Sequence, residues 1–179
     1  MAIWLKEGKS ESEIIEADEK VKRTVESILN DVSKRGDEAV RELSLKFDNY
    51  SPDNFILNKN EIENIIDRVN KRDLEDIKFA QDQVRNFAKK QLECLKDLEV
   101  ETMPGVVLGH KNIPVNSVGC YVPGGKYPMV ASAHMSVITA SVAGVKNITA
   151  SAPPQDGKPH PAIVSAMFYG GAHKIPVSY

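Results

Sequence analysis

The strongest local signal for chemistry is a turn, Pro123-Gly124-Gly125, which joins an apolar segment to a helix-forming one. Glycines at such a turn let a backbone approach a phosphate, and exposed N–H groups near the start of a helix favour anions. The motif is neither GxGxxG nor a Walker loop, and an ordinary strand-to-helix turn also explains it. Tyr121, two residues before the turn, either stacks on a base or packs against a neighbouring helix. Its spacing alone favours packing.

The histidines and cysteines show no spacing that is typical of a metal site or a catalytic group. The four histidines are His110, His134, His160 and His173. His134 falls in a segment of small residues and is predicted to face either a cleft or another helix. Cys120 ends an apolar segment and is predicted to be a buried small hydrophobe, and Cys94 has no visible partner. We therefore predict no metal site and no nucleophile from spacing.

The overall composition excludes several classes of protein. The 179 residues are 41% hydrophobic and 27% charged, with a formal net charge of −2. This near balance predicts no nucleic-acid partner and no anionic membrane surface. No apolar run approaches the roughly 20 residues that span a bilayer, and the first residues do not resemble a secretory signal. We expect a cytoplasmic protein with free thiols, because two cysteines are too few for a disulfide scaffold.

Composition changes near residue 100. Residues 1–99 contain 18 Lys or Arg, 23 Asp or Glu, 2 Gly and 1 Pro. Residues 100–179 contain 5 Lys, 2 acids, 9 Gly and 9 Pro. Charged sequence with few glycines and prolines is typical of helices with solvated faces, whereas apolar sequence broken by Gly and Pro is typical of buried strands and tight turns. The predicted domains are therefore a helical region, 1–99, and a second region, 100–179.

Apolar spacing predicts four helices and one short strand in the first region. The helices are expected over Val21–Val32, after Asp37 as N-cap, after Asn60 as N-cap, and after Asp73 as N-cap, and the strand over Phe55–Leu57. The residues that face solvent on these helices are Lys- and Glu-rich. No chemistry is predicted in this region.

The second region alternates between strand and helix patterns after a possible hairpin, Val100–Met103 with Val106–His110. Buried strands are predicted over Val115–Val122 and Val145–Ser151, with a third from His173, and helices over Ala131–Val142 and Pro161–Tyr169. Short connections between such elements imply a parallel sheet with right-handed crossovers. The predicted fold class is α/β: an N-terminal helical region followed by an incomplete Rossmann-like parallel βαβαβ unit. Ligands of such sheets bind at the carboxyl ends of the strands, here Tyr121–Gly125 and Ser151–Pro154.

Seven motifs in this order resemble the histidinol dehydrogenase family. They are Arg35–Ala39, Leu43–Asp48, Met103–Val106, Gly119–Gly125 with Tyr127-Pro128, Ala140–Val145, Ala152–Pro154, and Pro161–Ile163 leading to Gly171-Ala172. The resemblance runs from about Val21 to Ile175 and so covers most of the chain.

The resemblance implies an NAD-dependent, zinc-containing, homodimeric enzyme that acts on a small-molecule alcohol. In histidine biosynthesis the family oxidises L-histidinol to L-histidine by two successive hydride transfers to NAD. The family's fold has an incomplete Rossmann-like domain with NAD along the strand ends. Its tyrosine in the Tyr-Val-Pro-Gly-Gly position contacts NAD, which implies that Tyr121 binds the cofactor, with Pro123 and Pro153 as neighbours of the cofactor.

Two departures from the family pattern change what is expected. Ile138-Thr139-Ala140 stands where histidine-biosynthetic members usually carry a proline, so the chain is closer to paralogous dehydrogenases, some of which oxidise other small alcohols such as sulfopropanediol. Family members also continue beyond the third strand to a Gly-Gly-x-Gln turn, the zinc ligands and a Glu-His acid–base pair. No position of this sequence matches those residues, so no catalytic or metal-binding residue is assigned.

The chain is therefore expected to be an N-terminal piece of such an enzyme and to be inactive alone. The alternative from another class is a non-catalytic helical assembly module with a vestigial nucleotide-binding half.

Overall fold

The computed structural model describes residues 8, 10–124 and 127–178, which divide into two compact units, residues 1–43 and 44–179. The first unit contains helix α1 (Glu11–Arg35) and the start of α2 (Asp37–Asp48). Gly36, with φ +58, joins the two helices. The guanidinium of Arg35 donates hydrogen bonds to the carboxylates of Asp31 and Glu42 at 2.7–2.8 Å and so ties α1 to α2. The predicted helix over Val21–Val32 is confirmed as part of α1.

Two capped helices follow, α3 (Lys59–Ile66) and α4 (Lys71–Cys94). The N-cap of α3 is Asn58 rather than the predicted Asn60, because the Asn58 side chain accepts from the Glu61 amide at 3.0 Å. The N-cap of α4 is Asn70 rather than the predicted Asp73, whose amide donates to the Asn70 side chain at 2.8 Å. Both helices thus begin two or three residues earlier than predicted, at a side chain that satisfies a free backbone donor.

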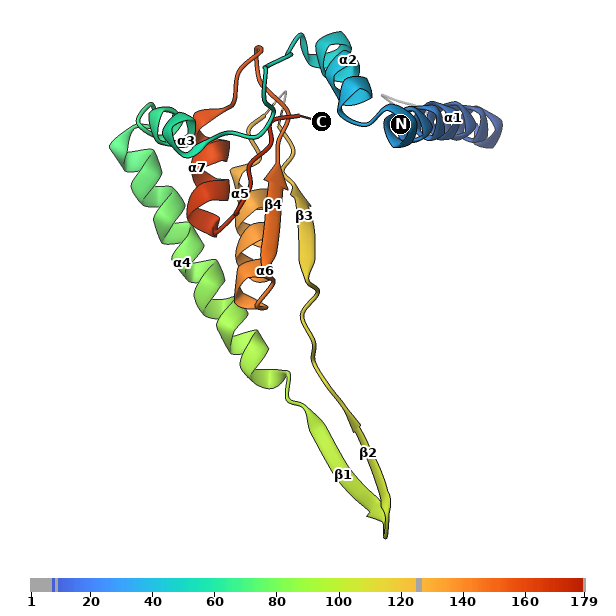
Figure 1. The fold of residues 1–179 in the computed structure, drawn as a ribbon, viewed down its shortest axis with the longest axis vertical. Helices are drawn as coiled ribbons and strands as arrows, with labels where there is room; N and C mark the ends of the chain where they lie inside the picture. The colour runs from blue at the N-terminus through green and yellow to red at the C-terminus, as the bar shows by residue number, and fades with distance from the viewer. Residues whose placement is uncertain (1–7, 9, 125–126, 179) are drawn as a thin grey trace, which may run out of the picture. The chain divides into compact units, whose positions relative to one another are not determined.

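The parallel sheet is built on β3 (Ser117–Tyr121) and β4 (Asn147–Ser151), paired in register (Figure 1). The crossover between them contains α5 (Val130–Ala133), the π-helical segment η1 (His134–Ile138) and α6 (Thr139–Val142). After β4 comes α7 (Pro161–Gly170), and the chain then returns beside β4 through parallel bridges at Lys174 and Val177. The predicted α/β fold class is confirmed.

The third strand and the strand over Phe55–Leu57 are present as isolated bridges rather than as full strands. Ile56 pairs antiparallel with Pro176, and the Leu57 amide donates to the Ile175 carbonyl at 3.0 Å. β3 is not the fully buried strand that its apolar sequence predicts. Among the described residues it pairs with β4 alone, and Ser117, Gly119 and Tyr121 are exposed on it.

The core lies between this small sheet and the helices α3, α4, α5 and α7. Its largest fully buried side chains are Ile138, Ile148, Ile163, Met167, Ile175, Val122, Val137, Val164 and Val177. Helix α4, which precedes residue 100, packs against η1, α6 and α7, which follow it. The change in composition near residue 100 therefore falls inside the second compact unit, residues 44–179. No described helix combines the length and the apolar character needed to cross a membrane.

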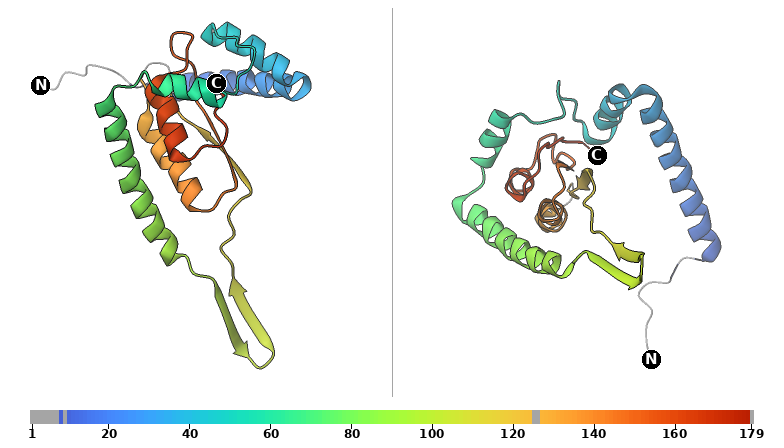
Figure 2. Two further views of the ribbon diagram at one scale, coloured as in Figure 1. Left: turned by 60° about the vertical axis from the view of Figure 1, so that its left-hand side comes forward. Right: turned by 60° about the horizontal axis from the view of Figure 1, so that its bottom comes forward.

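The predicted hairpin is confirmed as β1 (Leu98–Met103) and β2 (Val106–His110), an antiparallel pair that extends past the end of α4 (Figures 1 and 2). Every residue of both strands is exposed. The register places Val100 opposite Leu108 and Glu99 opposite Gly109. One face of the hairpin therefore carries Leu98, Val100 and Leu108 and is mostly apolar, with His110 opposite Leu98, and the other face carries the acidic side chains.

Candidate functional site

The carboxyl ends of β3 and β4 lie side by side because the two strands are parallel and in register. Tyr121 is the partner of Ser151, and the Val122 amide donates to the Ser151 carbonyl at 2.7 Å, one residue beyond the ladder. The loops that begin at Val122 and at Ala152 therefore leave the sheet at the same edge. This is the edge at which open α/β sheets bind their ligands.

Tyr121 presents its side chain at this edge. Its neighbours Cys120 and Val122 point into the core and are 5% and 0% exposed, whereas Tyr121 is 49% exposed. This difference follows from the alternation of side chains along a strand. Burial raises the pKa of the Cys120 thiol, as expected for the predicted buried small hydrophobe.

The turn after Tyr121, at Gly124, packs against Pro153 of the neighbouring loop. A Cβ atom on Gly124 would lie 3.1 Å from Cγ of Pro153 and 3.5 Å from Cδ1 of Ile163, so glycine allows the close approach of the two loops. Pro153 is fully buried beneath the turn, and Pro123 is partly exposed. Gly125 lies outside the described residues. The cofactor contacts of Tyr121, Pro123 and Pro153 stay predictions, and the structure gives Pro153 a packing contact with Gly124.

A cavity of about 480 Å³ lies where the loop after β4 meets the end of α2, lined by residues 46–49 and 154–157. Two of the atoms around it, Oδ2 of Asp48 and Oε1 of Gln155, are buried without a hydrogen-bond partner in the described part of the chain. Burial also raises the pKa of the Asp48 carboxyl. Both atoms can accept hydrogen bonds, so the cavity suits a ligand that carries N–H or O–H groups.

His110, His134 and His173 make hydrogen bonds, whereas Nδ1 of His160 is buried without a hydrogen-bond partner among the described residues. His134 is buried, and its Nδ1 lies 3.3 Å from Nε2 of Gln81, which also donates to the Ala166 carbonyl at 2.8 Å. The packing of His134 on helix α4 thus decides between the two predicted alternatives. Nδ1 of His173 accepts from the Ile148 amide at 2.9 Å. Within the described ranges, no group of three or more His, Cys, Asp or Glu side chains is placed to hold a metal ion.

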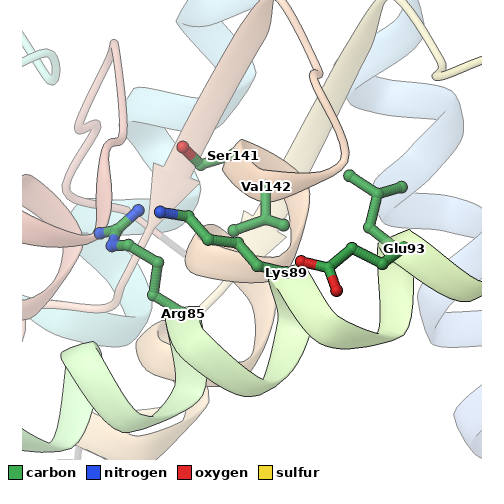
Figure 3. Close-up of a pocket in the computed structure, with 6 residues that line it drawn as sticks. Arg85, Lys89, Glu93, Ser141 and Val142 are labelled. Atoms are coloured by element: carbon green, nitrogen blue, oxygen red, sulfur yellow. The ribbon is translucent and has the colours of Figure 1, made fainter.

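Sequence reasoning predicted no chemistry in the first region, yet α4 contributes two cations to a cavity of about 580 Å³ (Figure 3). Arg85 and Lys89 reach this cavity from α4, and Ser141 reaches it from α6. The four-residue spacing of the cations is visible in the sequence. Their convergence on Ser141 depends on the packing of α4 on α6 and has no signal in the sequence.

Comparison with known proteins identifies the family. A sequence model described as histidinol dehydrogenase matches residues 12–177. The chain belongs to the histidinol dehydrogenase family. The family is one of dehydrogenases, and the resemblance found in the seven motifs is confirmed.

Two curated relatives cover most of this chain. A histidinol dehydrogenase homolog from Shouchella clausii is 54% identical over 98% of this chain and 41% of its own length. The sulfopropanediol 3-dehydrogenase of Ruegeria pomeroyi is 46% identical over 87% of this chain and 36% of its own length. The chain therefore spans well under half of the length of these histidinol dehydrogenase family relatives.

A solved structure shows the same fold. The crystal structure of histidinol dehydrogenase from Elizabethkingia anophelis matches with a TM-score of 0.80 and 24% identity, over 98% of this chain and 38% of that one. The helices and the small parallel sheet described above are thus the fold of the corresponding part of a histidinol dehydrogenase.

Proposed function

We propose that this chain is the N-terminal part of an NAD-dependent dehydrogenase of a small alcohol and that it supplies part of the cofactor site. The observation that carries the proposal is the exposed ring of Tyr121 at the carboxyl edge of the parallel sheet, followed by the Gly124 turn. An aromatic ring in this position can stack on an adenine or support a ribose. Family membership supports the dehydrogenase class.

The residues present fit a nucleotide better than a metal. The exposed ring of Tyr121 and the close turn over Pro153 suit a ligand with a flat ring. The described residues do not gather the side chains that zinc requires, so zinc is proposed only for longer members of the family, and no step is assigned to it here. NAD accepts the hydride when it is bound, and this chain contributes binding.

The relatives favour a substrate other than histidinol. The chain is 46% identical to the sulfopropanediol 3-dehydrogenase and 37% identical to the histidinol dehydrogenase of Methanosarcina barkeri. We therefore keep two candidates: histidinol in histidine biosynthesis, and a different small alcohol such as a sulfopropanediol. The difference in identity favours the second.

The cofactor role is tested by titrating the purified chain with NAD and following backbone amide chemical shifts. Only part of a cofactor site is present, so we expect a dissociation constant on the order of millimolar, about 4 kcal/mol. Tyr121→Ala should weaken binding and leave the melting temperature unchanged, because the ring is half exposed. Phe79→Ala removes another exposed aromatic ring, on α4, and should not affect binding. If saturating NAD leaves residues 121–124 unshifted, or if Tyr121→Ala unfolds the chain, the proposal is wrong.

The proposal also predicts no turnover by this chain alone. Oxidation of an alcohol needs a base for the hydroxyl proton, and no acid–base pair is assigned to these residues. Incubation with NAD, added zinc and either histidinol or sulfopropanediol should give no NADH absorbance above the blank. Sustained turnover would show that the reaction depends on residues of this chain that the proposal leaves out.

A further inference from the structure

The cavity between α4 and α6 has cationic and hydrogen-bonding side chains on facing walls. Its volume is about 580 Å³, and its lining residues are Arg85, Lys89, Leu92, Glu93, Ser141 and Val142. Figure 3 shows the side chains of Arg85 and Lys89 extending from α4 toward Ser141. We call this space the Arg85 cavity. It is distinct from the carboxyl edge of the sheet. Helix α6 ends at Val142, shortly before β4 begins, and so lies near the amino end of that strand.

The two cations of the Arg85 cavity have no carboxylate partner among the described residues. Arg85 and Lys89 are one helical turn apart and lie on the same face of α4. The guanidinium of Arg85 makes one long hydrogen bond, 3.4 Å, to the Tyr169 carbonyl at the end of α7. That bond uses one of its five N–H donors. Two like charges at this spacing repel each other, and a bound anion would relieve the repulsion.

Glu93 is the acidic side chain among the described residues that line the Arg85 cavity, and it is already paired. Both carboxylate oxygens of Glu93 accept from Nζ of Lys90, at 2.9 and 3.0 Å. Its charge therefore does little to neutralise Arg85 and Lys89, and the cavity keeps a net positive charge. Arg85 is also half-buried, which strengthens its attraction for an anion compared with a fully hydrated cation.

Ser141 offers a neutral donor on the opposite wall. Its hydroxyl makes no hydrogen bond within the part of the chain that the structure describes. Gly171, with φ +108, approaches so closely that a Cβ atom there would lie 3.3 Å from Oγ of Ser141. The lack of a side chain at Gly171 thus leaves the Ser141 hydroxyl uncrowded at this contact.

We propose that the Arg85 cavity binds an oxyanion, namely a phosphate group, either free or carried by a small metabolite. Arg85 presents a planar fork of N–H donors, Lys89 a point charge and Ser141 a hydroxyl, which together match the several oxygens of a phosphate. The cavity is larger than one phosphate group, and its apolar wall of Leu92 and Val142 can contact the carbon part of a phosphate monoester.

The test is a titration of the purified chain with inorganic phosphate and, separately, with glycerol 3-phosphate, followed by amide chemical shifts at constant ionic strength set with sodium chloride. Both ligands should shift the amides around Arg85 and Ser141, whereas chloride alone should not. Tighter binding of the monoester would identify a phosphorylated metabolite as the ligand. Equal binding of the two would identify the free anion.

Substitutions distinguish specific binding of phosphate in the Arg85 cavity from non-specific attraction of phosphate to positive charge. Lys89→Gln removes an exposed cation that has no hydrogen-bond partner among the described residues, and it should weaken phosphate binding about tenfold. Arg85→Gln should weaken binding at least as much. Lys71→Gln removes an exposed charge at the other end of α4 and should leave binding unchanged. If Arg85→Gln fails to fold, Lys89→Gln and Ser141→Ala still decide the outcome.

Equal weakening by Lys71→Gln and Lys89→Gln would overturn the proposal, since it would show non-specific electrostatic attraction. The absence of any shift at Ser141 would overturn it as well. NAD binding at Tyr121 is measured on different amides, so failure of this proposal is distinguishable from failure of the cofactor role.

Discussion

Gln81 is a polar side chain that holds three helices together inside the second compact unit. It lies on α4, donates to a carbonyl of α7 through Ala166, and lies beside Nδ1 of His134 on η1. It is 3% exposed, so these contacts replace its hydration. A buried polar group is stabilising only while its partners are present, which makes this residue sensitive to substitution.

We expect Gln81→Ala to lower the free energy of unfolding by about 1–3 kcal/mol, because the Ala166 carbonyl would lose its donor in a buried site. Urea denaturation measures the change. Gln83→Ala, an exposed position on the same helix, is the matched control and should change stability little. Equal effects of the two substitutions would mean that the buried hydrogen bond of Gln81 does not determine the result.

Buried His134 and half-buried His160 predict how stability depends on pH. Burial lowers the pKa of both His134 and His160 below the ordinary value of 6.5. The unfolded chain therefore binds protons at a higher pH than the folded one, so the free energy of unfolding is greatest above about pH 6.5 and falls as the pH drops through the lower folded values.

His134→Gln keeps a polar side chain without a titrating ring and should flatten this part of the pH profile, as measured by urea denaturation between pH 8 and pH 5. His160 should account for the remaining slope. An unchanged slope in the double variant His134→Gln/His160→Gln would contradict the assignment.

At the scale of elements, the first and last residues of a helix depend on side chains and glycines near its ends. The sequence predicts these positions only to within a few residues. The N-caps are the asparagines Asn58 and Asn70, a few residues before the predicted positions, because several polar residues near each helix start can serve as caps. The C-terminal end of α7 is clearer, since Gly171 adopts a left-handed conformation, φ +108, that other residues avoid.

Gly171→Ala should lower the free energy of unfolding by about 1 kcal/mol or more, because alanine is strained in the left-handed region and its Cβ would press on Oγ of Ser141. Gly119→Ala is the control. Gly119 lies in β3 with nothing within 4 Å of an added Cβ, and its φ is not in the left-handed region. Thermal melts of both variants check this, and a larger loss for Gly119→Ala would show that open space at β3 is needed for another reason.

At the scale of the whole molecule, the β1–β2 hairpin has two exposed strands that pair with each other and contribute no residue to the buried core. Leu98, Val100 and Leu108 share one face and are 51%, 44% and 57% exposed. A two-stranded hairpin without packing is marginally stable in water. The homodimer that the resemblance to the family implies would give this apolar face a partner.

Amides of β1 and β2 should exchange with solvent at least about tenfold faster than those of β3 and β4, because local opening costs little where few apolar contacts form. Hydrogen exchange at two protein concentrations tests this. Protection of the hairpin that rises with concentration would support the homodimer. Strong protection that does not depend on concentration would contradict the expected weakness of the hairpin.

The sequence by itself determined the order of elements, the parallel β–α–β core, the hairpin and the family. Each of these depends on local patterns such as apolar spacing, Gly and Pro at turns, or consecutive motifs. Only the tertiary structure decided that β3 is exposed at one edge, that Pro153 lies buried under Gly124, that His134 packs on Gln81, and that Arg85 and Lys89 meet Ser141. These contacts join residues far apart in the chain, and their geometry depends on how helices pack across the sheet, which residue types and spacing do not specify.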